Sequence, residues 1–226
     1  MNYKEKIFRY LGLIGLFAIL WQWLDRHYLY NRDKKDIFPL IVGTHGGYGY
    51  YFLLASVFMV LFLLLLAKEV KPFSLEIVSR AGRQKTFAMC FRQLVKSSLG
   101  YAFTYVMVQV IYVLIYVDWN LLMKNNFFFI MILYGIAVSV ILDFGGMIYL
   151  LMEILSENFV LSLLIAVGVN MGLAYFNKSV VLYGGLVIID EMTVDFIWWL
   201  SELINLCIIG ILYFITQSVY FKKDIL

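Results

Sequence analysis

The sequence predicts an all-α membrane protein with about six transmembrane helices and a short re-entrant segment before the last helix. Composition is the first observation behind this prediction, because 63% of the 226 residues are hydrophobic and only 15% are charged. A soluble domain carries about a quarter charged residues. The second observation is that the apolar residues form long continuous runs rather than the short alternating strands of a membrane barrel. The surplus apolar surface is therefore expected to face lipid.

Six runs approach the length of about 20 apolar residues that a helix needs to cross a bilayer. In chain order they are residues 7–24, 50–67, 99–117, 127–152, 159–175 and 196–216. Residues 25–39 are expected to form a polar loop after the first run, and residues 118–126 a short loop before the fourth. A polar turn at residues 156–158 separates the fourth run from the fifth. The apolar patch at residues 180–189 is too short to span, so we expect it to be re-entrant or interfacial.

The two termini are both expected on the cytosolic side of the cell membrane. The first run follows a charged start but lacks a small-residue cleavage site, which predicts an uncleaved first helix. Segments assigned inside hold more Lys and Arg than those assigned outside, as in most membrane proteins. All five tryptophans then fall at or near the outer interface. The chain is predicted to be one transmembrane domain over residues 1–226.

The longest charged region, residues 68–98, is predicted to be a cytosolic loop between the second and third helices. Pro72 ends the preceding helix, and residues 73–79 have the pattern of a short amphipathic helix. A basic turn at residues 80–83 follows. Beyond it, apolar residues at helical spacing predict that the third helix extends into the cytosol.

This loop resembles the coupling segment of type-2 ABC exporter permeases, especially the small Gram-positive ones for peptide export, antibiotic resistance or bacteriocin immunity. The resemblance implies a short coupling helix that docks onto a separate ATPase subunit. It also suggests that residues 3–9 form an interfacial elbow helix. The matching coupling residues are Ser74, Leu75, Glu76, Ile77, Val78, Ser79, Arg80, Gly82 and Arg83.

A function follows from this resemblance as an expectation. The chain would be the membrane-spanning subunit of an ATP-driven exporter for a hydrophobic or amphipathic substrate. ATP and Mg would bind the ATPase partner, and a second permease, either the same chain or a homologous one, would complete the dimeric pathway. Membrane lipid is the other expected partner. Nucleic acid is not expected, because no Lys/Arg stripe alternates with aromatic residues.

We expect no enzymatic activity, catalytic residue, metal or cofactor in this chain. It has no G-x-x-x-x-G-K-[ST] phosphate loop and no H-E-x-x-H zinc motif. Its two histidines, His27 and His45, precede the second apolar run, so intramembrane protease chemistry is not expected. Cys90 and Cys207 have no metal-site spacing, and no disulfide is expected between them.

Two carboxylates within apolar runs, Asp143 and Glu202, are the candidate residues inside the membrane. An ionisable group there must face protein or water. Each could line a translocation path or form an interhelical hydrogen bond. One alternative function is a stand-alone secondary transporter that uses Asp143. Another is a non-transporting immunity or sensor protein.

Glycines predict two places of close helix packing. One is Gly145-Gly146, next to Asp143, and the other is the G-x-x-x-G pair Gly168 and Gly172. The second pair has the spacing of a helix dimer face, although this spacing is common by chance in apolar helices.

Overall fold

The computed structural model is all-helical and describes residues 3–31, 48–70, 82–124, 126–176, 182–183, 186 and 196–223. Over these residues there are seven helices when α2, the π-helical turn and α3 are counted as one continuous helix. They are α1 (Tyr3–Asn31), α2 (Tyr51–Leu53) with the π turn (Leu54–Phe58) and α3 (Met59–Glu69), α5 (Arg83–Tyr116), α6 (Trp119–Lys124), α7 (Phe127–Ser156), α8 (Phe159–Phe176) and α10 (Phe196–Lys222).

Four helices among the described residues are long and apolar enough to cross a bilayer, which indicates a multi-pass membrane protein. They are Tyr51–Glu69, Arg83–Tyr116, Phe127–Ser156 and Trp198–Lys222. The predicted runs at 7–24 and 159–175 are also helical, within α1 and α8. That these two cross the membrane stays a prediction. The apolar part of α8, Phe159–Tyr175, is shorter than the usual span.

The helices expose large apolar side chains on their outer faces, as lipid contact requires. On α10, for example, Leu203, Leu206 and Phe214 are 60%, 57% and 67% exposed. Water would make such a surface costly, whereas hydrocarbon does not. The outward faces of the bundle therefore support the membrane assignment independently of composition.

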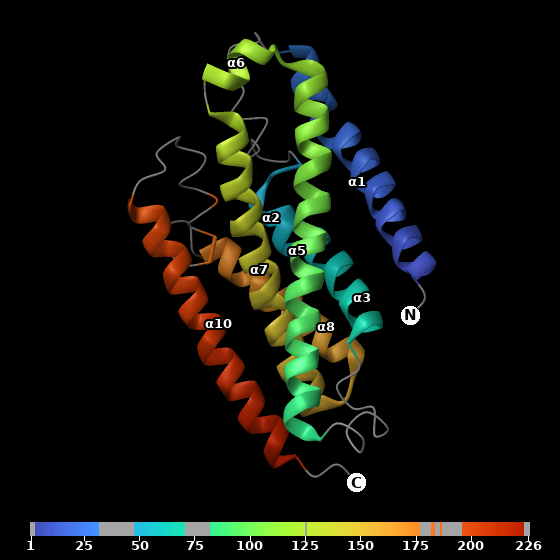
Figure 1. Ribbon diagram of the computed structural model, residues 1–226, viewed down its shortest axis with the longest axis vertical. Helices are drawn as coiled ribbons and strands as arrows, with labels where there is room; N and C mark the ends of the chain where they lie inside the picture. Colours follow the sequence, from blue (N-terminus) through green and yellow to red (C-terminus); the bar gives the residue numbers. More distant parts are fainter. Residues whose placement is uncertain are drawn as a thin grey trace.

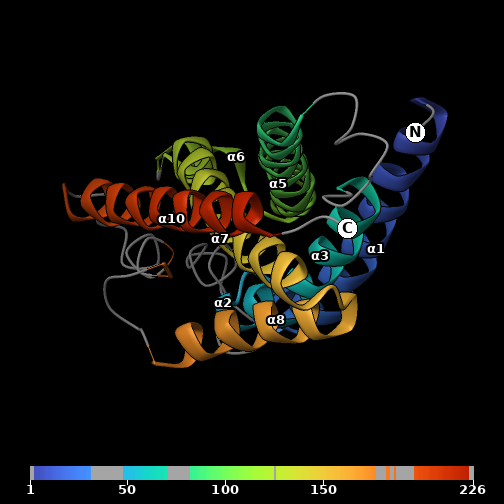
Figure 2. The ribbon, with the colours of Figure 1, turned by 90° about the horizontal axis from the view of Figure 1, so that it is seen from below.

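The bundle has two chemically different ends (Figure 1). At one end α5 begins, α3, α7 and α10 finish, and many lysines and arginines gather; we call it the basic end. Its described basic residues are Lys68, Arg83, Lys85, Arg92, Lys96, Lys222 and Lys223. At the opposite end, the α6 end, α5 finishes and α6 leads into α7. Seen from the basic end, α5 lies nearly end-on, while α8 and α10 are inclined (Figure 2).

Helix α7 lies at the centre and contacts α3, α5, α6, α8 and α10. Its pair Gly145-Gly146 makes the close approach that the sequence predicted. A Cβ atom on Gly145 would meet Met59 Sδ of α3 at 2.5 Å and Asn170 Nδ2 of α8 at 3.0 Å. A Cβ atom on Gly146 would collide with Leu94 of α5. By contrast, Cβ atoms on Gly168 and Gly172 would meet none of the described residues within 4 Å, so their role as a dimer face stays a prediction.

Two local predictions were wrong. Residues 118–126, expected as a loop, contain the short helix α6, whose Leu122 is fully buried. Residues 3–9, expected as a separate elbow helix, are the start of α1, which continues unbroken to Asn31. Burial of Leu122 stabilises the short helix α6. A continuous helix carries α1 through its charged first turns. Hydropathy alone indicates neither.

Candidate functional site

The described part of the predicted coupling segment is its exit into α5. Ser74, Leu75, Glu76, Ile77, Val78, Ser79 and Arg80 lie outside the described residues. Gly82 precedes α5 with a φ of 77°, a conformation that suits glycine. The next residue, Arg83, donates a hydrogen bond of 3.0 Å from Nη1 to the carbonyl oxygen of Phe221. The first residue of α5 is thus attached to the last turn of α10.

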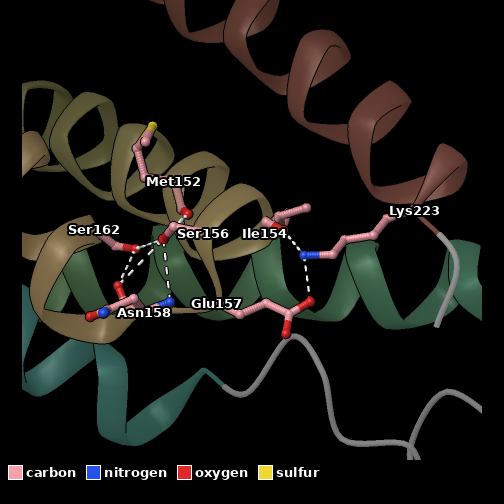
Figure 3. Close-up of polar contacts among 7 residues, drawn as sticks. All are labelled: Met152, Ile154, Ser156, Glu157, Asn158, Ser162 and Lys223. Carbon is pink, nitrogen blue, oxygen red and sulfur yellow. Dashed lines mark hydrogen bonds and ion pairs between the residues drawn. The ribbon is translucent and has the colours of Figure 1, made fainter. Parts of the chain in front are cut away.

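The end of α10 is attached in turn to the connection between α7 and α8 (Figure 3). Lys223 Nζ lies 2.7 Å from Glu157 Oε1 and also donates to the carbonyl oxygen of Ile154. A cation is favourable there because the last carbonyls of a helix carry partial negative charge. We call the two attachments, at Arg83 and at Lys223, the end brace.

The turn that receives Lys223 is itself well ordered. Glu157 ends α7 in the left-handed region, with a φ of 53°. Asn158 then caps α8, because its Oδ1 accepts the N–H groups of Val160 at 3.0 Å and Leu161 at 3.2 Å. Ser156 Oγ lies 3.2 Å from Ser162 Oγ across the turn (Figure 3). The brace therefore connects α5, α10 and a firmly capped α7–α8 turn.

Asp143 is bound to a neighbouring helix rather than left alone. Its Oδ1 lies 2.6 Å from Ser98 Oγ on α5. Ser98 is fully buried, and Asp143 is partly buried on the central helix α7. The geometry is that of an interhelical hydrogen bond, which was one of the two interpretations open from sequence.

A second polar contact of the same kind was not predicted from the sequence. Glu69, at the end of α3, lies with its Oε2 2.5 Å from Ser97 Oγ and 2.9 Å from Gln93 Nε2 on α5. Gln93 and Ser97 are four residues apart and so share one helix face, which is the signal that sequence offered. Together with Ser98 and Asp143, these residues join α3, α5 and α7 within one stretch of α5.

Glu202 is buried on α10, at 5% exposure. Its carboxylate interacts with the side chain of Asn205, one turn further on, although no hydrogen bond of normal geometry reaches either oxygen among the described residues. The Asn205 amide also holds Leu182, because its Oδ1 accepts the Leu182 N–H at 2.8 Å. Glu202 lies on α10 and Asp143 on α7, and no hydrogen bond joins the two carboxylates among the described residues.

The predicted re-entrant segment, residues 180–189, is described only at three positions. Leu182, Tyr183 and Leu186 are all buried. Tyr183 donates from its hydroxyl to Asn170 Oδ1 of α8 at 3.3 Å, and Leu182 is held by Asn205 of α10. These three residues pack inside the bundle between α8 and α10. Whether the rest of the segment enters the bilayer stays a prediction.

A buried tyrosine cluster near the α6 end was also missed from sequence. Tyr48 and Tyr105 stack with ring centroids 4.6 Å apart, and each hydroxyl donates to the other residue's carbonyl oxygen, at 3.2 and 2.8 Å. The N–H group of Tyr48 donates to Asp25 Oδ1 at 3.1 Å. Asp25, assigned to a polar loop from sequence, is in fact a buried residue that fixes the start of the second helix.

The described residues contain no group of three His, Cys, Asp or Glu side chains close enough to bind a metal ion. Cys90 and Cys207 are free thiols on α5 and α10. No protein-family model matches the chain, and no curated protein or solved structure matches it either. Function must therefore be argued from the end brace and from the buried polar contacts.

Proposed function

We propose that this chain is the membrane-spanning permease subunit of an ATP-driven ABC exporter whose ATPase is a separate chain. The ATPase would dock on the segment between α3 and α5 at the basic end. The chain would pair with a second permease to form the pathway for a hydrophobic or amphipathic substrate such as a peptide, antibiotic or lipid-like molecule. Because the ATPase is cytosolic, the basic end would face the cytosol, in accord with the positive-inside rule.

The observation that carries the proposal is the hydrogen bond from Arg83 to Phe221. An ATPase that moves the segment before Arg83 would pull on α5 directly, because α5 continues unbroken from Arg83 to Tyr116. At 1.5 Å per residue this helix is about 50 Å long, so it reaches from the docking segment across the whole bilayer.

The end brace would pass the same movement to the other helices. Arg83 holds the last turn of α10, and Lys223 joins that turn to Glu157 and Ile154. A displacement at the basic end would thus move α5, α10 and the α7–α8 turn together. Coupling of this kind needs rigid, contiguous contacts between the docking site and the helices.

Co-purification from native membranes in mild detergent tests the proposal. The tagged chain should bring down an ATPase, and Arg80→Glu should release it by reversing a charge in the docking segment. Arg80 is chosen rather than Arg83 because Arg83 also holds α10, so its replacement would change the bundle itself. Lys124→Glu at the α6 end is the matched charge reversal and should leave the complex intact.

Two results would contradict the proposal. If the unaltered chain brings down no ATPase, the exporter assignment is wrong. If an ATPase binds but Arg80→Glu retains it at the wild-type level, docking at the α3–α5 segment is wrong.

A second candidate function is a secondary transporter that uses Asp143. The observation in its favour is a carboxylate near the middle of the central helix, where ionisable side chains are expensive and commonly functional. The contact with Ser98 weighs against it, because an interhelical hydrogen bond already accounts for the residue. The two candidates predict different effects of Asp143→Asn: a secondary transporter would lose transport, whereas the exporter would keep it.

A further inference from the structure

A groove of about 360 Å³ lies between α5 and α7 on the outside of the bundle. Its lining comes from residues 99–110 of α5 and 128–139 of α7. Its lining includes three small residues, Ala102, Gly135 and Ser139, beside the buried Val106 and Met131, and more exposed side chains such as Phe103, Met107 and Ile132 form its rim. Ala102 is 2% exposed, whereas Phe103 and Ile132 are 66% and 63% exposed. The groove is therefore a crevice open to the surroundings of the bundle.

The groove offers an occupant no free hydrogen-bond donor. Ser139 is the single polar side chain among the described residues of the lining, and its hydroxyl already donates to the carbonyl oxygen of Ile136 at 2.8 Å. A polar group placed here could at most donate to Ser139 Oγ and would otherwise lose its partners, which is unfavourable in hydrocarbon surroundings. The part of a ligand that fits this groove is therefore an alkyl chain.

The length of the groove suits an alkyl chain. The groove extends along about a dozen residues of each helix, or roughly 17 Å at 1.5 Å per residue. That length is close to half of the roughly 30 Å hydrocarbon core, which is the depth of one leaflet.

The end of the groove nearest α6 lies at the depth expected for a lipid headgroup. Phe128, in the lining, packs against Trp119 of α6 with ring centroids 5.5 Å apart. Trp119 is 58% exposed, and Lys124 at the end of α6 is also exposed. Tryptophan and lysine are the side chains that anchor proteins at the membrane–water interface, where Lys124 would meet a phosphate. Asp118, next to Trp119, is an opposing charge in the described part of this region.

We propose that the α5–α7 groove binds one acyl chain of a phospholipid from the leaflet at the α6 end, with its phosphate at the level of α6. The inference requires only that α5 and α7 cross the membrane, and it does not depend on the transport function. The bound lipid would fill a space that neither helix closes by itself.

Photo-crosslinking of the full chain in phosphatidylglycerol vesicles tests this site. The probe is phosphatidylglycerol with a diazirine in the middle of one acyl chain, and adducts are mapped by mass spectrometry. Adducts on the groove lining should exceed those on exposed apolar residues of α10, such as Leu203 and Leu206, several-fold. Equal labelling of the two surfaces would overturn the proposal, because the groove would then hold only bulk lipid. Absence of adducts in the groove would overturn it too, because another protein segment would then fill the groove.

Two glycine variants make the test specific. Gly135→Leu puts a side chain into the groove, where the new Cβ would meet only Val106 Cγ2 at 3.7 Å, an ordinary contact. It should abolish the enrichment. Gly210→Leu adds the same atoms to α10, where a Cβ meets none of the residues that the structure describes within 4 Å, and should leave the enrichment unchanged. Phe103→Ala is a second groove variant, which removes an exposed rim side chain and should also lower the enrichment. Unchanged labelling in both groove variants would contradict the proposal.

Discussion

Ser98 Oγ lies 2.6 Å from Asp143 Oδ1 and, at the same time, 3.0 Å from the carbonyl oxygen of Val95. A hydroxyl group has one hydrogen and can donate to only one of these acceptors at a time. Both contacts are satisfied together when a group on Asp143 donates to Ser98 Oγ, so that Ser98 donates to Val95. An asparagine at position 143 supplies such a donor permanently.

We therefore predict that Asp143→Asn folds as stably as the wild type or slightly better. In the exporter proposed here it should also retain transport, because Asp143 then acts only as a contact between α5 and α7. Asp143→Leu removes the donor and acceptor together and should destabilise the bundle by about 1–2 kcal/mol, the range for interhelical hydrogen bonds in membranes. Reversible unfolding in mixed detergent micelles measures both effects.

Transport assays on the same variants separate the two candidate functions. If Asp143→Asn folds normally but abolishes transport in a system that needs no ATPase, the secondary-transporter alternative is correct. Ser98→Ala is the companion variant, because it removes the partner but keeps the carboxylate. It should weaken stability and leave transport intact when the role of the pair is structural.

The helical segments of this chain could be predicted from hydropathy, because each apolar run must satisfy its backbone within a helix. Run 127–152 corresponds to α7, Phe127–Ser156, and run 196–216 to α10, Phe196–Lys222. The polar extensions at the helix ends could not be predicted in this way. They are fixed by capping and by contacts such as that of Lys223 with Glu157, which join residues far apart in the sequence.

The candidate site could be predicted only in part, because its polar contacts also join residues far apart in the sequence. Asp143 stood out because a carboxylate in an apolar run is rare. Its partner Ser98 did not stand out, because serine is unremarkable in any segment. The family resemblance placed Arg83 in the docking segment for a partner, and that role stays a prediction; the structure adds that its guanidinium binds the Phe221 carbonyl of the same chain. The charge pattern identifies the basic end of the bundle. Only the packing of the helices shows that Arg83 already binds a carbonyl of its own chain.

The attachment of α5 to α10 predicts that Arg83 stabilises the last turn of α10. Arg83→Ala should loosen the last turn of α10, at a cost of about 0.5–1 kcal/mol, because the hydrogen bond to Phe221 is partly exposed. Hydrogen–deuterium exchange of residues 217–222 should become faster. Lys85→Ala, an exposed charge removal on the same helix, is the control and should leave that exchange unchanged. Equal protection in Arg83→Ala and the wild type would show that the contact does not hold α10.

Asn205 is predicted to fix the segment that precedes α10. Its side chain accepts the N–H of Leu182, a residue with a positive φ of 58°. Asn205→Leu would leave that buried group without a partner, at a cost of about 1–3 kcal/mol. In a Leu186→Cys background, the variant should increase labelling of the cysteine by a small maleimide. Asn120→Leu, the same substitution at an exposed position on α6, should not. If labelling is low in both, Asn205 is not what holds this segment inside the bundle.

The two glycine pairs should respond in opposite ways to a single methyl group. At Gly146 a Cβ would collide with Leu94 and come within 3.3 Å of Leu66 Cδ2, so Gly146→Ala should destabilise the bundle by about 1–3 kcal/mol. At Gly172 a Cβ meets no atom of the described part of the chain within 4 Å, and Gly172→Ala should be neutral or slightly stabilising because alanine favours a helix. Unfolding in mixed micelles compares the two variants.

If the G-x-x-x-G face instead joins two copies of the chain, Gly172→Ala would lower the dimer fraction in crosslinking while the unfolding of the monomer stays the same. Equal destabilisation by both variants would contradict this packing, since of the two glycines only Gly146 faces another of the described helices.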